Sequence, residues 1–208
     1  GLAKPALAQD FPSRPVRILV PFAPGGFTDI LGRYIADKLS QALGQTVLID
    51  NKPGAGGNIA AEQVTKAAPD GHTLILASVS VFSINQALYS SLPYDPADLA
   101  ILGVAATQPN ILLAYPGLGV NSVPELIAAA KAKPGQIAYG SFGVGSVSHL
   151  TAAMLAAQAG VEMLHVPYRG SAPAQADLIA GRVQILFDGA GTALPQVRAG
   201  TARAIGLS

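Results

Sequence analysis

A repeated order of short apolar run, glycine- or serine-containing turn and amphipathic segment constrains this chain more than any other feature. The first unit has an apolar run at 16–22, a turn at 23–26 and a segment at 28–43 whose apolar residues recur with helical spacing. Strands joined through helices run parallel and carry helices on both faces. The order therefore predicts an α/β fold with mostly parallel sheets. Later units begin at the predicted strands 46–50, 73–77, 99–106, 111–114, 137–139, 163–166, 184–187 and 204–207.

The predicted units fall into two groups that separate near residues 106–111. We therefore expect two lobes, the first over 11–107 and the second over 108–203. The final residues, 204–208, are predicted to cross back toward lobe 1.

Composition narrows the function. Charged residues make up 12% of the chain, and 13 basic against 12 acidic residues give a formal net charge of +1. A nucleic-acid or membrane-surface protein needs a basic patch, so both partners are disfavoured. The absence of cysteine excludes zinc fingers, iron–sulfur sites and thiol nucleophiles, and the three isolated histidines do not have metal-ligand spacing. We expect a monomer without a cofactor.

The first ten residues are interpreted as a leader. Ala6-Leu7-Ala8 has the small-x-small form of a signal-peptidase site. Residues 1–10 are therefore predicted to be the remnant of a secretory signal, which implies export. An arbitrary leader is the alternative.

Three glycine-rich turns, at 23–28, 53–58 and 140–148, stand where predicted strands give way to helices. Such turns can present successive backbone N–H groups at helix N-termini to an anion. The alternative is that the glycines only make tight turns. Nucleotide binding is disfavoured because the chain has no Gly-Lys pair, and Ile59 occupies the last glycine position of a dinucleotide fingerprint.

Several polar residues follow predicted strands and are candidates for the site. Asp29 could cap its helix or fix the preceding loop around a ligand. Tyr168 could supply a hydroxyl group to a carboxylate, Asp188 could organise a loop, and Ser78 and Ser80 are possible hydroxyl donors.

A hydrolase built on Ser146 and His149 is the weaker enzymatic alternative. The nucleophile elbow needs glycine where Val144 and Ser148 stand, and His149 is too close in sequence to be a convincing base. We expect the other histidines to be structural, His72 in a solvated loop and His165 buried in a strand.

Four motifs in this order resemble the Bug family, the periplasmic substrate-binding proteins of the tripartite tricarboxylate transporter system. They are PFAPGGFTD, NKPGAGGNIAAEQVTKAAPDGHTL, GSFGVGSVSHL and VPYRGSAPAQADLIAGRV. The resemblance covers residues 11–208 and implies a two-lobed, type II periplasmic-binding-protein fold that closes on a small carboxylate. By position it implies a ligand site at Phe22, Gly25, Gly26, Thr28, Asp29, Ser78, Ser80, Gly145, Ser146, His149, Tyr168 and Asp188.

The resemblance also implies partners and a location. A family member captures a mono-, di- or tricarboxylic acid in the periplasm and delivers it to a membrane permease. The alternative is a receptor that presents its closed form to a sensor kinase. Family members are longer, with a final segment that completes the first lobe. That C-terminal part is expected to be missing here, which would leave apolar surface exposed on lobe 1.

Overall fold

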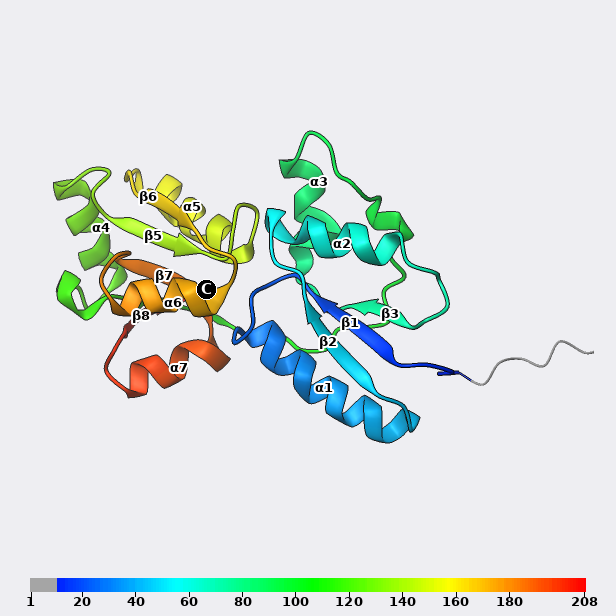
Figure 1. Ribbon diagram of the computed structural model, residues 1–208. Coiled ribbons are helices and arrows are strands. Elements are labelled where there is room, and N and C mark those ends of the chain that lie inside the picture. The colour runs from blue at the N-terminus through cyan, green and yellow to red at the C-terminus, as the bar shows by residue number, and fades with distance from the viewer. Residues whose placement is uncertain (1–10) are drawn as a thin grey trace, which may run out of the picture.

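The computed structural model describes residues 11–208 and has two lobes side by side (Figure 1). The predicted leader lies outside the described residues. Lobe 1 contains a three-stranded sheet in the order β2-β1-β3, and lobe 2 a five-stranded sheet in the order β6-β5-β7-β4-β8. The chain passes between them just before residue 110.

Lobe 1 is built around three parallel strands. The amphipathic helix α1 covers one face of this sheet, where Ala36 and Leu39 pack against Val16 and Ile18. Helix α2 and the short helices after β3 cover the other face through Ala61 and its neighbours. The elements are β1 (Val16–Val20), α1 (Phe27–Leu43), β2 (Val47–Asn51), η1 (Ala55–Gly57), α2 (Asn58–Thr65), β3 (Thr73–Ile75), η2 (Ser80–Ile84), α3 (Asn85–Leu88) and η3 (Pro96–Asp98).

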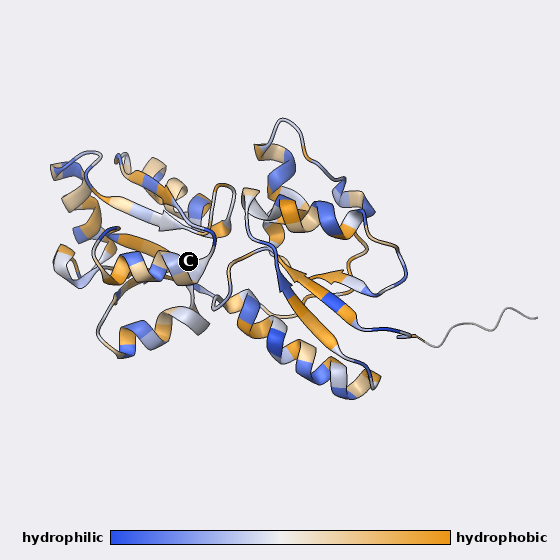
Figure 2. Cartoon of the chain, in the orientation of Figure 1, coloured by the Kyte–Doolittle hydropathy of each residue, from blue (hydrophilic) through white to orange (hydrophobic). Residues whose placement is uncertain are grey.

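Lobe 2 is a sheet covered on both faces. Leu126 of α4 and Ala152 of α5 pack on one face, and Leu178 of α6 and Ala193 of α7 pack on the other. In Figure 2 largely hydrophobic strands lie between helices, and each helix carries a hydrophilic and a hydrophobic stripe, as the sequence pattern predicts. The elements are β4 (Asn110–Ala114), η4 (Pro116–Leu118), α4 (Val123–Ala132), β5 (Ala138–Ser141), α5 (Val147–Ala159), β6 (Leu164–Pro167), α6 (Ser171–Ile179), β7 (Ile185–Gly189), α7 (Ala190–Arg198) and β8 (Arg203–Leu207).

Four of the six strand pairings are parallel, and the antiparallel ones both involve β4. This strand enters lobe 2 directly from lobe 1, so no helical crossover forces it to run parallel to its neighbours. Strand β8 is an edge strand of the lobe 2 sheet, and its carboxyl end, at Leu207, lies beside Ile111 where the chain enters the lobe. The predicted crossing strand thus belongs to the second sheet.

The predicted strand at 99–106 is wrong. These residues have no regular secondary structure in the described chain, and Ile101, Leu102 and Val104 are among its most exposed apolar residues. An apolar run becomes a strand only where a neighbouring strand accepts its backbone hydrogen bonds. No described strand pairs with this segment.

His72 is not in a solvated loop, contrary to expectation. Its side chain is buried beside Phe11, with the ring centroids 5.0 Å apart, and its Nδ1 lies 3.2 Å from the Asp70 carboxylate.

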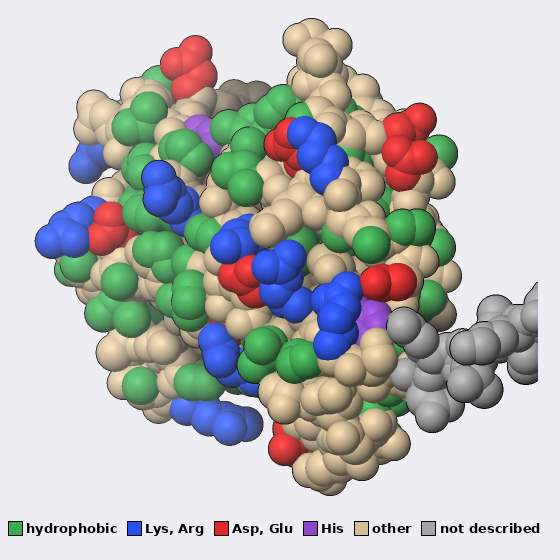
Figure 3. All heavy atoms as spheres, turned by 45° about the vertical axis from the view of Figure 1, so that its right-hand side comes forward, with side chains coloured by type: hydrophobic (Ala, Val, Ile, Leu, Met, Phe, Trp, Pro, Cys, Tyr) green, Lys and Arg blue, Asp and Glu red, His purple; other side chains and the backbone are tan. Residues whose placement is uncertain are grey.

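None of the described helices is long and apolar enough to span a membrane. On the face in Figure 3, basic and acidic side chains are interspersed, without a patch of one sign.

Candidate functional site

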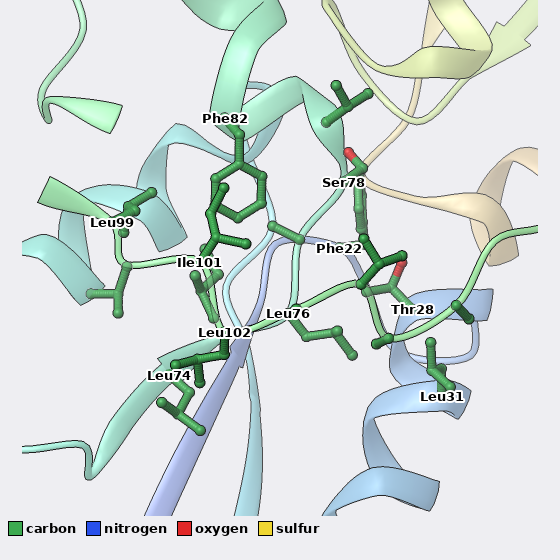
Figure 4. A pocket seen from close by; sticks show the side chains of 18 of the residues that line it. Phe22, Thr28, Leu31, Leu74, Leu76, Ser78, Phe82, Leu99, Ile101 and Leu102 are labelled. Carbon is green, nitrogen blue, oxygen red and sulfur yellow. The ribbon is translucent and has the colours of Figure 1, made fainter. Parts of the chain in front are cut away.

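A cavity of about 950 Å³ extends from the junction of the two lobes along the free edge of β3 (Figure 4). We call its two parts the polar end and the apolar end. The polar end is lined by residues of both lobes that lie in loops, at strand ends and in the first turns of helices, namely Phe22, Gly26, Thr28, Ser78, Phe142, Ser146, Ser171, Asp188 and Gly189. The apolar end is lined mainly by Leu74, Leu76, Phe82, Leu99, Ile101 and Leu102.

Four helix N-termini meet at the polar end. Helix α1 begins after Gly26, α5 after Ser146, α6 after Gly170 and α7 after Gly189. At α7 the first N–H groups already donate to the segment that enters lobe 2, Ala190 to the Pro109 carbonyl at 3.1 Å and Gly191 to Gln108 Oε1 at 3.3 Å. The N-termini of α1, α5 and α6 are therefore the ones that can offer N–H groups to a ligand. The first N–H groups of a helix lack partners within the helix, and the helix dipole makes its N-terminus electropositive. The polar end therefore suits an anion.

No Lys or Arg lines the cavity among the described residues. An anion bound there would be held by backbone N–H groups and hydroxyl groups, without a full countercharge. The hydroxyl groups of Thr28 and Ser78 lie beside Phe22 at this end (Figure 4). Both can rotate to donate a hydrogen bond to a ligand oxygen.

The lobes contact each other through backbone groups beside the cavity. The Ala23 N–H donates to the Arg169 carbonyl at 2.8 Å, and the Ser80 hydroxyl donates to the Gly145 carbonyl at 3.0 Å. Gly145 has φ +82°, and a Cβ there would come within 2.7 Å of Leu88 in lobe 1. The glycine allows both the left-handed turn and this close approach.

Asp29 is buried and organises the loop before α1. Its carboxylate accepts hydrogen bonds from the Gly25 N–H, Arg33 Nε and Asn51 Nδ2, each at 3.0 Å. Burial opposes ionisation, but these hydrogen bonds and the Arg33 charge outweigh it, so the pKa of Asp29 lies below its usual value. Of the two predicted roles, the geometry matches the one in which Asp29 fixes the loop.

Asp188 is the buried carboxylate of the polar end. It accepts hydrogen bonds from the Ser171 hydroxyl at 3.0 Å, from the Gly189 N–H at 2.9 Å and from the Gln175 amide. Burial raises its pKa, although these donors favour the charged form. The Gln175 amide also donates to the Thr192 carbonyl at 2.9 Å. Asp188 therefore links α6 to α7 at the floor of the cavity.

The geometry does not form a serine-hydrolase dyad. The Ser146 hydroxyl donates to the Gly143 carbonyl at 2.7 Å, and its oxygen accepts from the backbone N–H of His149 at 3.3 Å. The His149 imidazole instead accepts from the Gly145 N–H through Nδ1 at 3.3 Å. The ring thus binds the backbone of the 142–146 loop at Gly145 and is not placed to take a proton from Ser146.

The predicted site residues thus divide into two sets. Phe22, Gly26, Thr28, Ser78, Ser146 and Asp188 line the cavity. Gly25, Asp29, Ser80, Gly145, His149 and Tyr168 lie outside that lining and are engaged in contacts within or between the lobes. The Tyr168 hydroxyl, for example, donates to Asp177 at 2.8 Å, which with burial raises the pKa of the tyrosine to about 12.

Sequence reasoning missed three positions of the polar end, Phe142, Ser171 and Gly189, and all of the apolar end. Gly170-Ser171 and Gly189-Ala190 each follow a strand and open a helix, as the three glycine-rich turns do. The same criterion would therefore have found two of them. Within the described chain, no cluster of acidic, histidine or cysteine side chains could hold a metal ion.

Residues 31–208 match the family described as tripartite tricarboxylate transporter family receptor. BugT of Bordetella pertussis is 36% identical over 209 residues, which cover 100% of this chain and 64% of BugT. The chain spans 59% and 64% of the length of two other curated relatives, each 40% identical.

Solved structures agree with this similarity. MatC from Rhodopseudomonas palustris, with bound malate, is 34% identical with a TM-score of 0.90, over 95% of this chain and 67% of MatC. An R. palustris protein with adipate is 38% identical with a TM-score of 0.87, over the same shares of the two chains. Two further similar structures are named as a periplasmic transporter and a periplasmic binding protein. The fold is therefore that of the periplasmic binding proteins.

Proposed function

The chain belongs to the tripartite tricarboxylate transporter receptor family, and we propose that it captures a small carboxylate between its lobes for uptake by a permease of that system. The observation that carries this proposal is the meeting of the N-termini of α1, α5 and α6 in a cavity whose described lining has no Lys or Arg. Backbone N–H groups at helix N-termini bind carboxylates in this manner.

The two ends of the cavity suit an amphipathic ligand, with a charged end and an apolar end. One carboxylate would lie at the polar end, against the N-termini of α1 and α5 and the hydroxyl groups of Thr28 and Ser78. The aliphatic body of the acid would extend toward Leu76 and the apolar end. MatC holds malate and the other R. palustris structure holds adipate, so both of these similar proteins bind small carboxylic acids.

Capture would couple to lobe closure. Lobes 1 and 2 both line the cavity, so a bound acid stabilises the closed arrangement and shifts the population toward it. The periplasm is the proposed location, supported by the signal-like Ala6-Leu7-Ala8 motif and by the similar periplasmic proteins.

Thermal unfolding with a panel of acids tests the proposal. We would measure the melting temperature with malate, succinate, adipate, citrate and benzoate at millimolar concentration, with butane-1,4-diol as the uncharged control. An acid at about one hundred times its Kd stabilises a protein by about 2.7 kcal/mol. That stabilisation raises the melting temperature of a chain of this size by about 5–10 °C. A sharp transition that no acid moves would contradict the carboxylate assignment.

A matched pair of variants locates the binding. Ser78→Ala removes a hydroxyl group at the polar end, whereas Ser90→Ala removes one from an exposed position outside the cavity lining. We expect Ser78→Ala to weaken binding about ten- to hundredfold, the usual effect of one lost hydrogen bond to a charged group. Ser90→Ala should bind as the unmodified chain does.

A further inference from the structure

Three aromatic rings form a stack behind the cavity loop of lobe 2. Tyr139 from β5 lies on His165 from β6, with centroids 4.9 Å apart and planes 17° apart. His165 lies in turn on His149 from α5, with centroids 4.2 Å apart and planes 26° apart. The stack therefore joins two strands and the helix that begins at the cavity.

The same two imidazoles are linked by hydrogen bonds to the loop that forms part of the cavity wall. His149 Nδ1 accepts from the Gly145 N–H at 3.3 Å. His165 Nε2 lies 2.6 Å from the Ser141 hydroxyl oxygen, which also accepts from the Gly143 N–H at 3.2 Å. Gly143 and Gly145 belong to the 142–146 loop, which places Phe142 and Ser146 in the cavity.

This network requires both imidazoles to be uncharged. The Gly145 N–H needs a lone pair on His149 Nδ1, and a charged ring has none. The buried Ser141 oxygen already accepts from the Gly143 N–H, so we assign the Ser141 hydroxyl proton to the bond with His165 Nε2. With that assignment, a protonated His165 would leave the hydroxyl proton without an acceptor. Two charged rings at a centroid distance of 4.2 Å would also repel each other.

The surroundings favour the neutral rings. The titratable groups packed around each imidazole are the other imidazole and Tyr139, whose pKa is raised by burial. Burial lowers the pKa of His149 and, with the charge of His149 when protonated, lowers that of His165 to about 4. No salt bridge of the described chain involves either ring.

We propose that His149 and His165, with Ser141, are positioning residues that hold the 142–146 loop in its ligand-binding conformation, and that carboxylate capture weakens when these imidazoles become protonated. The inference rests on the proposed function for the identity of the ligand. The loop's dependence on the rings does not rest on it.

The test uses variants that imitate the neutral acceptors. Asparagine places an oxygen near the position of His Nδ1, and glutamine places one near His Nε2. We therefore compare the double variant His149→Asn/His165→Gln with the unmodified chain and with His149→Ala. The third histidine provides the matched control, His72→Gln, because His72 lies in lobe 1 and does not line the cavity.

Carboxylate affinity is measured by calorimetry from pH 8 to pH 4 for each protein. The affinity of the unmodified chain should fall as the pH approaches the lowered pKa values of the two rings, about 4 for His165, by up to tenfold per pH unit for each proton taken up. The double variant should bind at pH 7.5 within about threefold of the unmodified chain and lose this acid-dependent fall, whereas His149→Ala should bind at least about tenfold more weakly at pH 7.5. His72→Gln should keep the pH profile of the unmodified chain. Protonation of the ligand and of Asp188 is common to all the proteins, so it cancels in the comparison.

A measurement without ligand separates the two proposals. NMR titration of the free chain follows the imidazole carbons of His149 and His165 and the amides of Gly143 and Gly145. We expect the amides to shift with the same midpoints as the imidazoles. Amides that do not follow the rings, or a double variant that keeps the full acid-dependent loss of affinity, would overturn the inference. A chain whose amides follow the rings but which binds no acid would instead overturn the proposed function.

Discussion

The two lobes bury the apolar surface of their sheets to different extents. In lobe 2 every residue of β7 is buried, and helices cover both faces of the sheet. In lobe 1 the last strand, β3, is three residues long and only half-buried. The 99–106 segment exposes Ile101 and Leu102 beside the free edge of this strand. Since burial of apolar surface is the main source of stability, lobe 2 should be the stable half of the site and lobe 1 the half that opens first.

The largest expected effect comes from truncating one leucine in each lobe, a buried one in lobe 2 and an exposed one in lobe 1. Leu113→Ala removes a fully buried side chain from β4, whereas Leu102→Ala removes one that is 83% exposed. We expect the first to lower the free energy of unfolding by about 3 kcal/mol and the second by less than about 0.5 kcal/mol.

Urea denaturation followed by circular dichroism measures both values. Leu39→Ala, on the partly buried face of α1, is a useful intermediate control. Equal losses from Leu113→Ala and Leu102→Ala would contradict the difference between the lobes.

Lobe 1 nevertheless has one rigid polar centre, at Asp29. All three of its partners donate hydrogen bonds, so Asp29→Asn replaces an acceptor by an amide that points N–H groups at other donors. We expect a loss of about 2 kcal/mol, together with weaker acid binding because the Gly25 loop is released. Asp37→Asn, exposed on the same helix, should change stability by less than about 0.5 kcal/mol. Similar unfolding curves for the two variants would contradict the role of Asp29 in holding the Gly25 loop.

The parts of this arrangement that could be predicted are those whose signals lie within a single segment of the sequence. The order of strands and helices was predictable because apolar spacing and glycine turns lie within each segment. The absence of a strand at 99–106 was not, because a strand depends on a partner elsewhere in the sheet. The antiparallel direction of β4 likewise depends on where the chain enters lobe 2.

The site shows the same limit. The cavity loops could be located from their glycines, and Thr28 and Ser78 from their places after strands. The position of the His149 ring depends on His165, from a different strand, and the Tyr168 hydroxyl bonds to Asp177 across a turn. Such pairings arise from tertiary packing, so a pattern of single residues does not predict which polar groups face the ligand.

Acid should reduce the difference in stability between the lobes. The pKa of His165 is lowered in the folded chain to about 4, so the unfolded chain binds more protons below pH 6.5. The stabilisation from the neutral ring is complete above pH 6.5 and is lost as the pH falls toward 4. The pKa of Asp29 is also lowered, but from 3.8, so its contribution persists until the pH falls below 3.8.

Between pH 6.5 and pH 4.5 lobe 2 should therefore lose on the order of 1 kcal/mol while lobe 1 changes little. Hydrogen exchange of the β5 and β1 amides, corrected for the intrinsic pH dependence, would report the two lobes separately. His165→Gln should abolish the change in β5. Loss of protection in β1 ahead of β5 would show that the histidine stack does not set the acid response.

The smallest effect concerns the apolar end of the cavity, where exposed leucines add little to the stability of the described chain. Leu102→Ser should leave the free energy of unfolding within about 0.5 kcal/mol of its original value, because the side chain is already 83% exposed. Its removal should still reduce the fluorescence of a bound hydrophobic dye, since Leu102 belongs to a continuous apolar surface with Ile101 and Leu74 (Figure 4). Leu207→Ser, at a side chain that is 74% exposed at the edge of the lobe 2 sheet, is the control and should leave the dye signal unchanged. Dye binding that falls with Leu207→Ser and not with Leu102→Ser would place the exposed apolar surface on lobe 2 and invert the comparison between the lobes.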